Sequence, residues 1–434
     1  MSPHVAVVSG DILPFPGLPT TGAGLRAWGL GKGLESKGFE VSYLMPDSSL
    51  MKIETHRRER VRTMENLRLF TFENINRIIG ELSPDVLVVQ HWPTVYSIDT
   101  TRLPTALDLH GPILLETMYQ DNPNYDALKQ MKIEAFHKCD FFTCPAERQR
   151  YYFYPWMLLA GCDLRTTSIE VVPVSVSPDT PQFEKPKEVR FVYGGVLLPW
   201  HNPTVGLEVL VETIEARATG RLSIYCGKHP YVNIPPGKLQ GLLDHLRASP
   251  WVSVNGMLAR EDVIDVYCHS SVAFDAMERN PERELAFTTR TVEYLWCGLP
   301  VIYQNYSILA PYIERYRAGW LVDPEDRDQI RQVIEHILSH PEEIEEKGRN
   351  AQRLVRREFT WDGTIDPLAS FCDKPFKLQK SPDLIGRLRG EIDHVREATS
   401  KAKHDVRQAW YYLSEGTVKE LILAIRRRIK MGRE

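Results

Sequence analysis

Short apolar runs alternate with amphipathic stretches along most of the chain. Residues 4–9 (HVAVVS), 85–89 (DVLVV) and 104–109 (PTALDL) are short, rich in β-branched residues and apolar on both faces, which is typical of strands buried in a parallel sheet. Stretches with helical spacing lie between them, such as 22–37 and 74–81. This alternation predicts an α/β fold with doubly wound parallel sheets.

The alternation restarts after a proline-containing linker at residues 179–188, which follows a strand predicted at 169–176. Further strands are predicted at 189–193, 221–226, 252–255, 272–274 and 301–303, each followed by a helical segment. We therefore expect two Rossmann-like domains, 1–180 and 181–360. Residues 381–434 read as a helical tail whose end, 421–430, combines apolar residues with a basic cluster.

The segment 284–305 (ELAFTTRTVEYLWCGLPVIYQN) contains the clearest local signals. Thr288 and Thr289 can cap a helix N-terminus, residues 290–296 give two turns, and Cys297-Gly298-Leu299-Pro300 ends the helix before a strand. A helix N-terminus with Arg290 beside it suits a phosphate. Glu293 would face the same crevice and accept hydrogen bonds from two hydroxyls. The alternative is an ordinary capped helix with one surface glutamate.

Composition limits the class of protein. The 434 residues are 43% hydrophobic and 25% charged, as in soluble globular proteins, and the net charge of −4 argues against a nucleic-acid partner. Seven scattered cysteines lack a C-x-x-C pair, so neither a zinc site nor a disulfide framework is expected. The first residues do not resemble a signal peptide, and no apolar run approaches the ~18 residues of a spanning helix. These features predict a cytoplasmic protein.

Three other segments are candidate sites, and each also has a plainer interpretation. The glycines at 22–24 follow the first strand by about a dozen residues, which argues against a dinucleotide fingerprint. His110 follows the 104–109 strand, at the edge where open α/β sheets bind ligands, although it could be an ordinary loop histidine. Asp326-Arg327-Asp328 has an Asp-x-Asp form that could bind a metal ion, but its place at a helix start favours capping. No metal site is predicted.

The sequence Glu-Tyr-Leu-Trp-Cys-Gly-Leu-Pro-Val-Ile at 293–302 resembles the E-A-x-A-x-G-x-P-V-I segment of GT-B glycosyltransferases, the family 4 type in particular. The fuller form from Thr289 is similar to a subgroup found in bacterial surface-polysaccharide gene clusters, as are Asp108 to Glu116 and Ala146 to Arg150. The resemblance covers roughly residues 4–375. It implies two domains facing a cleft, with the sugar acceptor on the first and the nucleotide-sugar donor on the second, and a crossover at 361–380 back to the first.

The resemblance also implies an activity and a set of residues. It implies a retaining, metal-independent hexosyl- or deoxyhexosyltransferase that uses a nucleotide-sugar, needs no cofactor, and acts on a glycan or lipid-linked glycan in polysaccharide biosynthesis. The residues implied in catalysis are His110, Glu116 and Arg290. The donor would be bound by Gly24, Gly194, Gly195, His201, Gly227, Lys228, Thr289, Arg290, Thr291 and Glu293.

The chain departs from the family pattern at two places. Leu285 stands where the E-x7-E pattern has its first glutamate, and Glu282 or Glu284 could serve instead. Gly195 and His201 stand roughly where many members have an arginine and a lysine for the pyrophosphate. Two alternatives therefore stay open: a nucleotide-sugar 2-epimerase and a catalytically inactive scaffold subunit. The basic tail could lie on the inner face of the cell membrane or be a packing helix.

Overall fold

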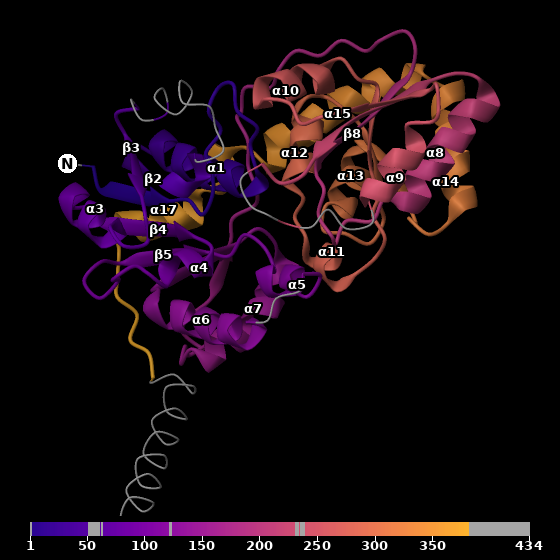
Figure 1. Ribbon diagram of the computed structural model, residues 1–434. Helices are drawn as coiled ribbons and strands as arrows, with labels where there is room; N and C mark the ends of the chain where they lie inside the picture. The colour runs from indigo at the N-terminus through magenta and orange to yellow at the C-terminus, as the bar shows by residue number, and fades with distance from the viewer. Residues whose placement is uncertain are drawn as a thin grey trace, which may run out of the picture.

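The computed structural model describes residues 2–50, 61, 64–120, 124–230, 234 and 239–381. The predicted basic tail lies outside this range from residue 382 onward. The described chain forms two α/β units that lie side by side (Figure 1). Each unit is built on its own parallel sheet, which confirms the fold class predicted from the alternation of apolar and amphipathic stretches.

The first unit has a seven-stranded parallel sheet in the order β3-β2-β1-β4-β5-β6-β7. Its strands are β1 His4–Val8, β2 Glu40–Pro46, β3 Leu67–Phe70, β4 Val86–Gln90, β5 Thr105–Asp108, β6 Phe141–Cys144 and β7 Ile169–Val171. Its described helices are α1 Gly22–Ser36, η1 Asp47–Leu50, α3 Ile75–Leu82, α4 Trp92–Val95, α5 Ile113–Thr117, α6 Tyr125–Lys138 and α7 Glu147–Leu159. The strand order reverses direction between β1 and β4, which creates a crevice where ligands bind in such folds.

The second unit has a six-stranded parallel sheet in the order β10-β9-β8-β11-β12-β13, which reverses between β8 and β11. Its strands are β8 Arg190–Val196, β9 Arg221–Gly227, β10 Val252–Asn255, β11 Val272–Asp275, β12 Val301–Gln304 and β13 Gly319–Val322. Its described helices are α8 Thr204–Arg217, α9 Leu239–Leu246, α10 Arg260–Cys268, α11 Pro281–Leu285, α12 Thr289–Trp296, α13 Ala310–Tyr316, α14 Arg327–Ser339 and α15 Glu342–Glu358.

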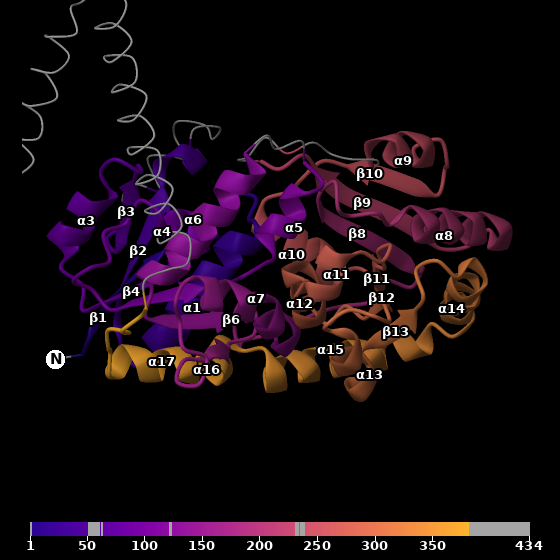
Figure 2. The ribbon, with the colours of Figure 1, turned by 90° about the horizontal axis from the view of Figure 1, so that it is seen from below.

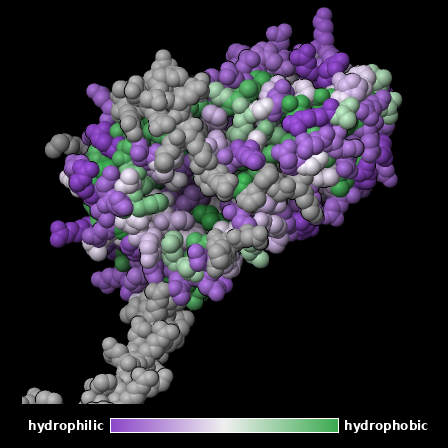
Figure 3. Space-filling model, in the orientation of Figure 1, coloured by the Kyte–Doolittle hydropathy of each residue, from purple (hydrophilic) through white to green (hydrophobic). Residues whose placement is uncertain are grey.

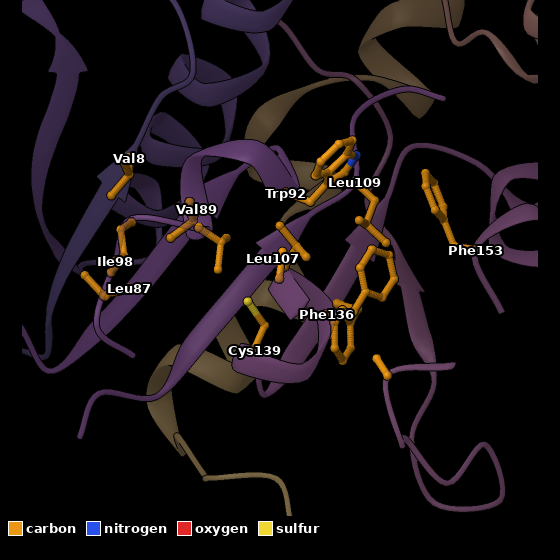
Figure 4. Close-up of a cluster of buried hydrophobic side chains, with 14 of the residues drawn as sticks. Val8, Leu87, Val89, Trp92, Ile98, Leu107, Leu109, Phe136, Cys139 and Phe153 are labelled. Carbon is orange, nitrogen blue, oxygen red and sulfur yellow. The ribbon is translucent and has the colours of Figure 1, made fainter. Parts of the chain in front are cut away.

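Alternate residues of each strand are buried on opposite faces of the first sheet. Leu87 and Val89 pack on one face with Leu107, against Phe136 of α6 and Phe153 of α7 (Figure 4). The intervening residues of β4 pack on the other face, under α1. Because both faces are covered by helices, the strands are apolar throughout, and this is why their sequences form short continuous hydrophobic runs.

The last helices return to the first unit. After α15, helices α16 Trp361–Thr364 and α17 Asp366–Asp373 run beneath the first sheet (Figure 2). Ile365 and Leu368 are buried there in the same core as α1. Beyond α17, Lys380 Nζ donates to the carbonyls of Phe136 and His137 at the C-terminal end of α6, at 2.9 and 2.8 Å. This places the last described residues firmly on the first unit.

Several elements differ from the sequence prediction. The strand predicted at 169–176 ends at Val171, because Pro173 has no N–H for the ladder. Val176 instead pairs with Thr360 in an isolated bridge between the linker and the end of α15. Strand β3 and the short helices α4, α5 and α11 were not predicted, since segments of about one turn carry little periodicity. None of the described helices is both long and apolar enough to cross a membrane.

Candidate active site

A cavity of about 330 Å³ lies between the two units. It is lined by the carboxyl ends of strands and the loops after them: the β1–α1 loop and the residues following β4 and β5 from one side, and the end of β8 with α10, α11 and α12 from the other. The space-filling view shows a hollow at this junction, while hydrophilic residues cover most of the outer face of the second unit (Figure 3). The cavity therefore lies at the switch points of both sheets.

Arg290 is fixed across the two central strands of the second sheet. Its Nη1 donates to the carbonyl of Gly194 in β8 at 2.7 Å, and its Nη2 to Asp275 Oδ1 at the end of β11 at 2.5 Å. Thr291 Oγ1 donates to the other carboxylate oxygen of Asp275 at 2.5 Å. The guanidinium also lies 5.1 Å from the ring of Tyr193. Burial by itself lowers the pKa of Arg290, but Asp275, Tyr193 and Tyr294 together raise it well above its usual value, so a permanent cation lines the cavity.

Glu293 lies one turn after Arg290 and lines the same cavity. Its Oε1 accepts from Arg260 Nε at 3.1 Å, and Arg260 Nη2 lies 3.0 Å from the same oxygen. Burial raises the pKa of Glu293, and Arg260 opposes that rise. The sequence suggested a carboxylate that is free to accept hydrogen bonds from a ligand. In the structure it is held by Arg260, a cation that the sequence did not predict.

Two histidines of the first unit meet at the cavity. His110 follows β5 as predicted, and His91 follows β4; their rings lie 5.5 Å apart, edge to face. Burial lowers the pKa of His110 to about 3 and that of His91 to about 4, so both rings are neutral at neutral pH. His91 has a φ of 66°, a conformation that costs a non-glycine residue energy and is concentrated at functional sites. His91 could have been found by the argument that selected His110.

Glu116 of α5 faces α11 of the second unit across the cavity. Glu282 in α11 is buried and holds Arg283 through two contacts of 2.5 and 2.7 Å. Burial, and then the charge of Glu282, raise the pKa of Glu116 to about 8, although Arg283 opposes this. Among the described residues, no hydrogen bond or ion pair engages the Glu116 carboxyl group. It is therefore a neutral acid at neutral pH, available to a ligand.

His201 also lines the cavity, in the loop after β8. Burial lowers the pKa of its imidazole well below the usual value, and the nearby Arg283 and Arg290 lower it further. The ring is therefore neutral, and it is not the cation that a lysine at this place would supply. Its Nδ1 is buried and has no hydrogen-bond partner among the described residues.

The predicted site residues fall into two groups. The cavity is lined by His110, Glu116, Gly195, His201, Thr289, Arg290 and Glu293. Five predicted residues do not line the described part of the cavity: Gly24, Gly194, Gly227, Lys228 and Thr291. Gly194 and Thr291 support Arg290 from below the surface, through the contacts given above. Lys228 is exposed outside the cavity.

Gly24 has a packing role. A Cβ on Gly24 would lie 1.6 Å from the carbonyl oxygen of Ile12, so only glycine allows helix α1 to approach that loop. Its N–H donates to Thr21 Oγ1, the cap of α1, at 3.2 Å. Its backbone is therefore already engaged. Thr288 is likewise the N-cap of α12 by position, but its hydroxyl makes no capping bond, contrary to expectation.

Asp326 and the cysteines, for which the sequence also supports predictions, lie outside the cavity. Asp326 accepts hydrogen bonds from the N–H groups of Asp328 and Gln329, which confirms its capping role at the start of α14. All seven cysteines are buried free thiols. In the part of the chain that the structure describes, no group of three or more His, Cys, Asp or Glu side chains is placed to hold a metal ion.

Contacts on two sides of the cavity join the units. On one side, Gly17 N–H donates to Glu261 Oε1 at 2.5 Å, and Arg260 N–H donates to the Leu18 carbonyl at 3.1 Å. Helices α1 and α12 also lie side by side there (Figure 1). The units are therefore closed on each other on this side by bonds to backbone groups.

On the other side, α7 supplies the contacts between the units. Gln149 Nε2 donates to the Leu285 carbonyl at 2.8 Å, and Arg148 Nη1 to the Tyr306 carbonyl at 2.6 Å. Both residues belong to the Ala146 to Arg150 segment that the sequence singled out.

Several buried polar atoms without a partner collect around this cavity. Within the described residues, they include Arg290 Nε, His201 Nδ1, His110 Nδ1, Gln149 Oε1 and Thr20 Oγ1, which belong to both units. A buried polar atom without a hydrogen bond costs about 1–3 kcal/mol. Such atoms gathered around one cavity indicate where a polar ligand completes the network.

Comparison with known sequences gives two matches. Residues 208–370 match the model of the family described as "Glycosyl transferase-like". A segment of 105 residues is 30% identical to a D-inositol 3-phosphate glycosyltransferase from Gordonia bronchialis, covering 24% of this chain and 23% of that protein. This chain therefore spans about a quarter of the length of the curated relative it matches.

Comparison with solved structures gives similarity over most of the described chain. Sucrose-phosphate synthase from Thermosynechococcus elongatus superposes with a TM-score of 0.64 at 15% identity, covering 86% of this chain and 98% of that one. A trehalose-6-phosphate synthase gives a TM-score of 0.60 at 12% identity, covering 86% and 100%. With two parallel sheets facing a shared cavity, the chain has the GT-B fold, and residues 208–370 match the glycosyl transferase-like family.

Proposed function

We propose that this protein is a retaining glycosyltransferase that uses a nucleotide-sugar donor and a glycan or lipid-linked glycan acceptor, in polysaccharide biosynthesis. One observation carries the proposal. Arg290 and Glu293 lie one turn apart on α12, so a fixed cation and a carboxylate line the same wall of the cavity between the units. Three residues of helix span about 4.5 Å, which suits a diphosphate beside the ribose that carries it.

The geometry supports a separate role for each group. The Arg290 guanidinium is held by Asp275 and Gly194 before any ligand arrives, so it can stabilise the charge that develops on the departing diphosphate without reorganising. Arg290 Nε remains available as a buried donor. Glu293 would accept hydrogen bonds from the ribose hydroxyls. These roles need no bound ion, and we propose that the enzyme works without a metal or another cofactor.

The first unit would hold the sugar and the acceptor. His110 would contact the sugar near the reacting carbon, with His91 beside it. Glu116 would contact the acceptor as a neutral acid that donates a hydrogen bond. In the retaining step, the bond from the sugar carbon to phosphate oxygen breaks, and a bond to the acceptor oxygen forms on the same face. The acceptor's proton passes to the departing phosphate, so no protein nucleophile is required.

Retention and the donor class are supported by what is reported of structural neighbours. One solved structure of a trehalose-6-phosphate synthase is described in terms of glycosyltransfer with retention. Another neighbour, from E. coli, is bound with UDP-2-fluoro glucose, with a TM-score of 0.56 at 11% identity. Those statements concern the neighbours. For this chain they support a hexose or deoxyhexose donor as the first class to test.

Glu282 is our candidate for the sugar-binding role that Leu285 cannot fill. Glu282 lines the cavity and is oriented by Arg283, whereas Glu284 is half-exposed and pairs with Arg279 at 2.7 Å. Leu285 contributes its carbonyl to Gln149 instead of a side chain to the site. We propose that Glu282, three positions earlier, contacts hydroxyls of the donor sugar.

The proposal is tested first by thermal shift of the purified protein with UDP, GDP, dTDP, CMP and their sugars. A ligand that binds only the folded state stabilises it and so raises the melting temperature. At a ligand concentration one hundred times the Kd, the free energy of unfolding increases by about 2.7 kcal/mol. We expect a shift with one nucleoside diphosphate that is markedly smaller in Glu293→Gln. The identified donor is then incubated with and without glycan acceptors, and product stereochemistry is read by NMR.

Each rival gives a different result. A 2-epimerase would convert the donor sugar in the absence of any acceptor. A scaffold subunit would show no shift with any nucleotide. Transfer with inversion would retain the glycosyltransferase assignment but contradict the retaining mechanism.

A further inference from the structure

Arg260 is the residue at which the first unit, the cavity and Glu293 meet. It is the first residue of α10, and its backbone N–H donates to the carbonyl of Leu18 in the β1–α1 loop of the first unit at 3.1 Å. The neighbouring Glu261 accepts from Gly17 N–H of the same loop. Arg260 and Glu261 of α10 are therefore hydrogen-bonded to the consecutive residues Leu18 and Gly17 of the opposite unit.

The side chain of Arg260 extends in the other direction, to α12. Its Nε and Nη2 lie 3.1 and 3.0 Å from one oxygen, Oε1 of Glu293. The guanidinium also lies 5.8 Å from the ring of Trp296, one turn further along α12. The side chain is 25% exposed and that of Glu293 is 12% exposed, so solvent screens this pair only in part. Two charge-assisted contacts to one oxygen fix the orientation of the carboxylate.

The charge on Glu293 depends on this contact. An ionised carboxylate only accepts hydrogen bonds, whereas protonation turns one of its oxygens into a donor and weakens it as an acceptor for two hydroxyls. Burial raises the pKa of Glu293 and Arg260 opposes that rise. The other titratable groups that interact with Glu293 are Tyr267, on α10 with Arg260, and Cys297, the C-cap of α12. Both are neutral at neutral pH, because burial raises the pKa of each well above its usual value. Arg260 is therefore the cation that favours the ionised form of Glu293.

We propose that Arg260 is a positioning residue that couples closure of the β1–α1 loop to the orientation of Glu293 toward the hydroxyls of the donor ribose. The backbone of Arg260 contacts the opposite unit and its side chain holds Glu293. Docking of the β1–α1 loop on Arg260 therefore also orders the side chain of Glu293. Opening of the units breaks the Leu18 contact and releases the N-terminal end of α10. The inference rests on the proposed donor site.

The test uses the full chain with Arg260→Gln and measures the Kd of the nucleoside diphosphate found in the thermal-shift screen, from about pH 6 to about pH 9. Loss of the Arg260 cation raises the pKa of Glu293 further, so more of this carboxyl group is protonated near neutral pH. We expect binding about tenfold weaker near neutral pH that recovers toward the wild-type value as pH rises, because Glu293 then ionises without help. We also expect KM for the donor to rise more than kcat falls.

Two variants separate positioning from structural support. Glu261→Ala removes one contact to the Gly17–Leu18 loop but leaves Arg260, so binding should weaken with an unchanged pH profile; a shifted profile would overturn the assignment. In the double variant Arg260→Gln/Glu293→Gln, binding should equal that of Glu293→Gln alone, and additive losses would overturn it. Should Arg260→Gln not fold, Arg260→Lys carries the same test, with a smaller shift of the profile expected.

The matched control is Arg247→Gln, since Arg247, the residue after α9, forms an exposed ion pair with Asp244. It should bind as the wild type does. If the wild-type protein binds no nucleoside diphosphate at any pH, the proposed function fails. If the wild type binds but Arg260→Gln has the same affinity and the same pH profile, only the present inference fails. A lower melting temperature with unchanged binding would likewise overturn it.

Discussion

Arg290 and Asp275 form a buried ion pair that joins helix α12 to the end of β11, with 2.5 Å between Nη2 and Oδ1. The same guanidinium reaches the carbonyl of Gly194 in β8, so it bridges the two strands at which the order of the second sheet reverses. The sheet thus supplies both the place for an anionic ligand and the means of fixing the cation there. The contribution of the ion pair to stability can therefore be measured separately from the contribution of Arg290 to catalysis.

Removal of Arg290 should affect stability and activity through different partners. Arg290→Met leaves Asp275 as an uncompensated buried charge, which costs about 3–5 kcal/mol. The double variant Arg290→Met/Asp275→Asn should recover most of that free energy of unfolding. It should remain at least about a hundredfold less active, because the stabilisation of the departing diphosphate is still absent. Denaturant unfolding and initial rates measure the two effects. Recovery of activity in the double variant would contradict the role of Arg290.

The pH dependence of stability should reveal Glu116. Its folded pKa of about 8 lies above its ordinary value of 4.5. Between these values the folded state binds more protons than the unfolded state, so this group lowers stability progressively as pH rises through that window. Glu116→Gln cannot ionise and should therefore gain stability relative to wild type at pH 8 but not at pH 5. The difference between the two unfolding curves measures this; an equal difference at both values would contradict the raised pKa.

Gly195 should tolerate no side chain. Its φ of 127° is unfavourable for other residues, and a Cβ there would lie 2.5 Å from Arg290 Nη1. We expect Gly195→Ala to cost about 1–3 kcal/mol of stability and to weaken nucleotide binding by displacing Arg290. The matched control is Gly80→Ala at an exposed position of helix α3, where no atom lies within 4 Å of the new methyl group. That control should gain up to about 1 kcal/mol. Equal effects in the two variants would argue against a special role for Gly195.

The α7 contacts should hold the units closed. Arg148→Ala/Gln149→Leu removes the hydrogen bonds to the carbonyls of Tyr306 and Leu285. At about 1 kcal/mol for each bond, the ratio of closed to open protein should fall roughly 30-fold. Small-angle X-ray scattering should then show a larger radius of gyration without ligand, reversed by the donor. Arg165→Ala, which disrupts only an exposed pair with Asp163, is the control. An unchanged radius would mean that other contacts determine closure.

The basic end of the chain should bind anionic membranes if the proposed acceptor is lipid-linked. Replacement of Arg426, Arg427, Arg428 and Lys430 by glutamine in the full chain removes four cations. At about 1 kcal/mol for each, binding to vesicles containing phosphatidylserine should weaken roughly a thousandfold. Cosedimentation measures this, with phosphatidylcholine vesicles as the control and high salt expected to abolish binding. Equal binding by both proteins would favour a packing helix.

The sequence by itself determined most of the longer elements and the local part of the site. Strand and helix periods depend on neighbours along the chain, so the two parallel sheets could be predicted from the alternation of apolar runs and amphipathic stretches. Arg290 and Glu293 are one turn apart on any helix that includes both, so their shared exposure to one crevice was also predictable. His110 could be placed because the carboxyl ends of parallel strands meet at one edge.

Only the tertiary structure decided what each of these groups contacts. Arg260 precedes Glu293 by 33 positions and is brought to it by the packing of α10 beside α12. The pKa of Glu116 is raised first by burial and then by the charge of Glu282 on the opposite unit, and no pattern within either segment encodes that meeting. Gly24, expected at a phosphate, is instead required by the carbonyl of Ile12. Charges and close approaches depend on distances between segments remote in the chain, and those distances are set by sheet order and domain closure.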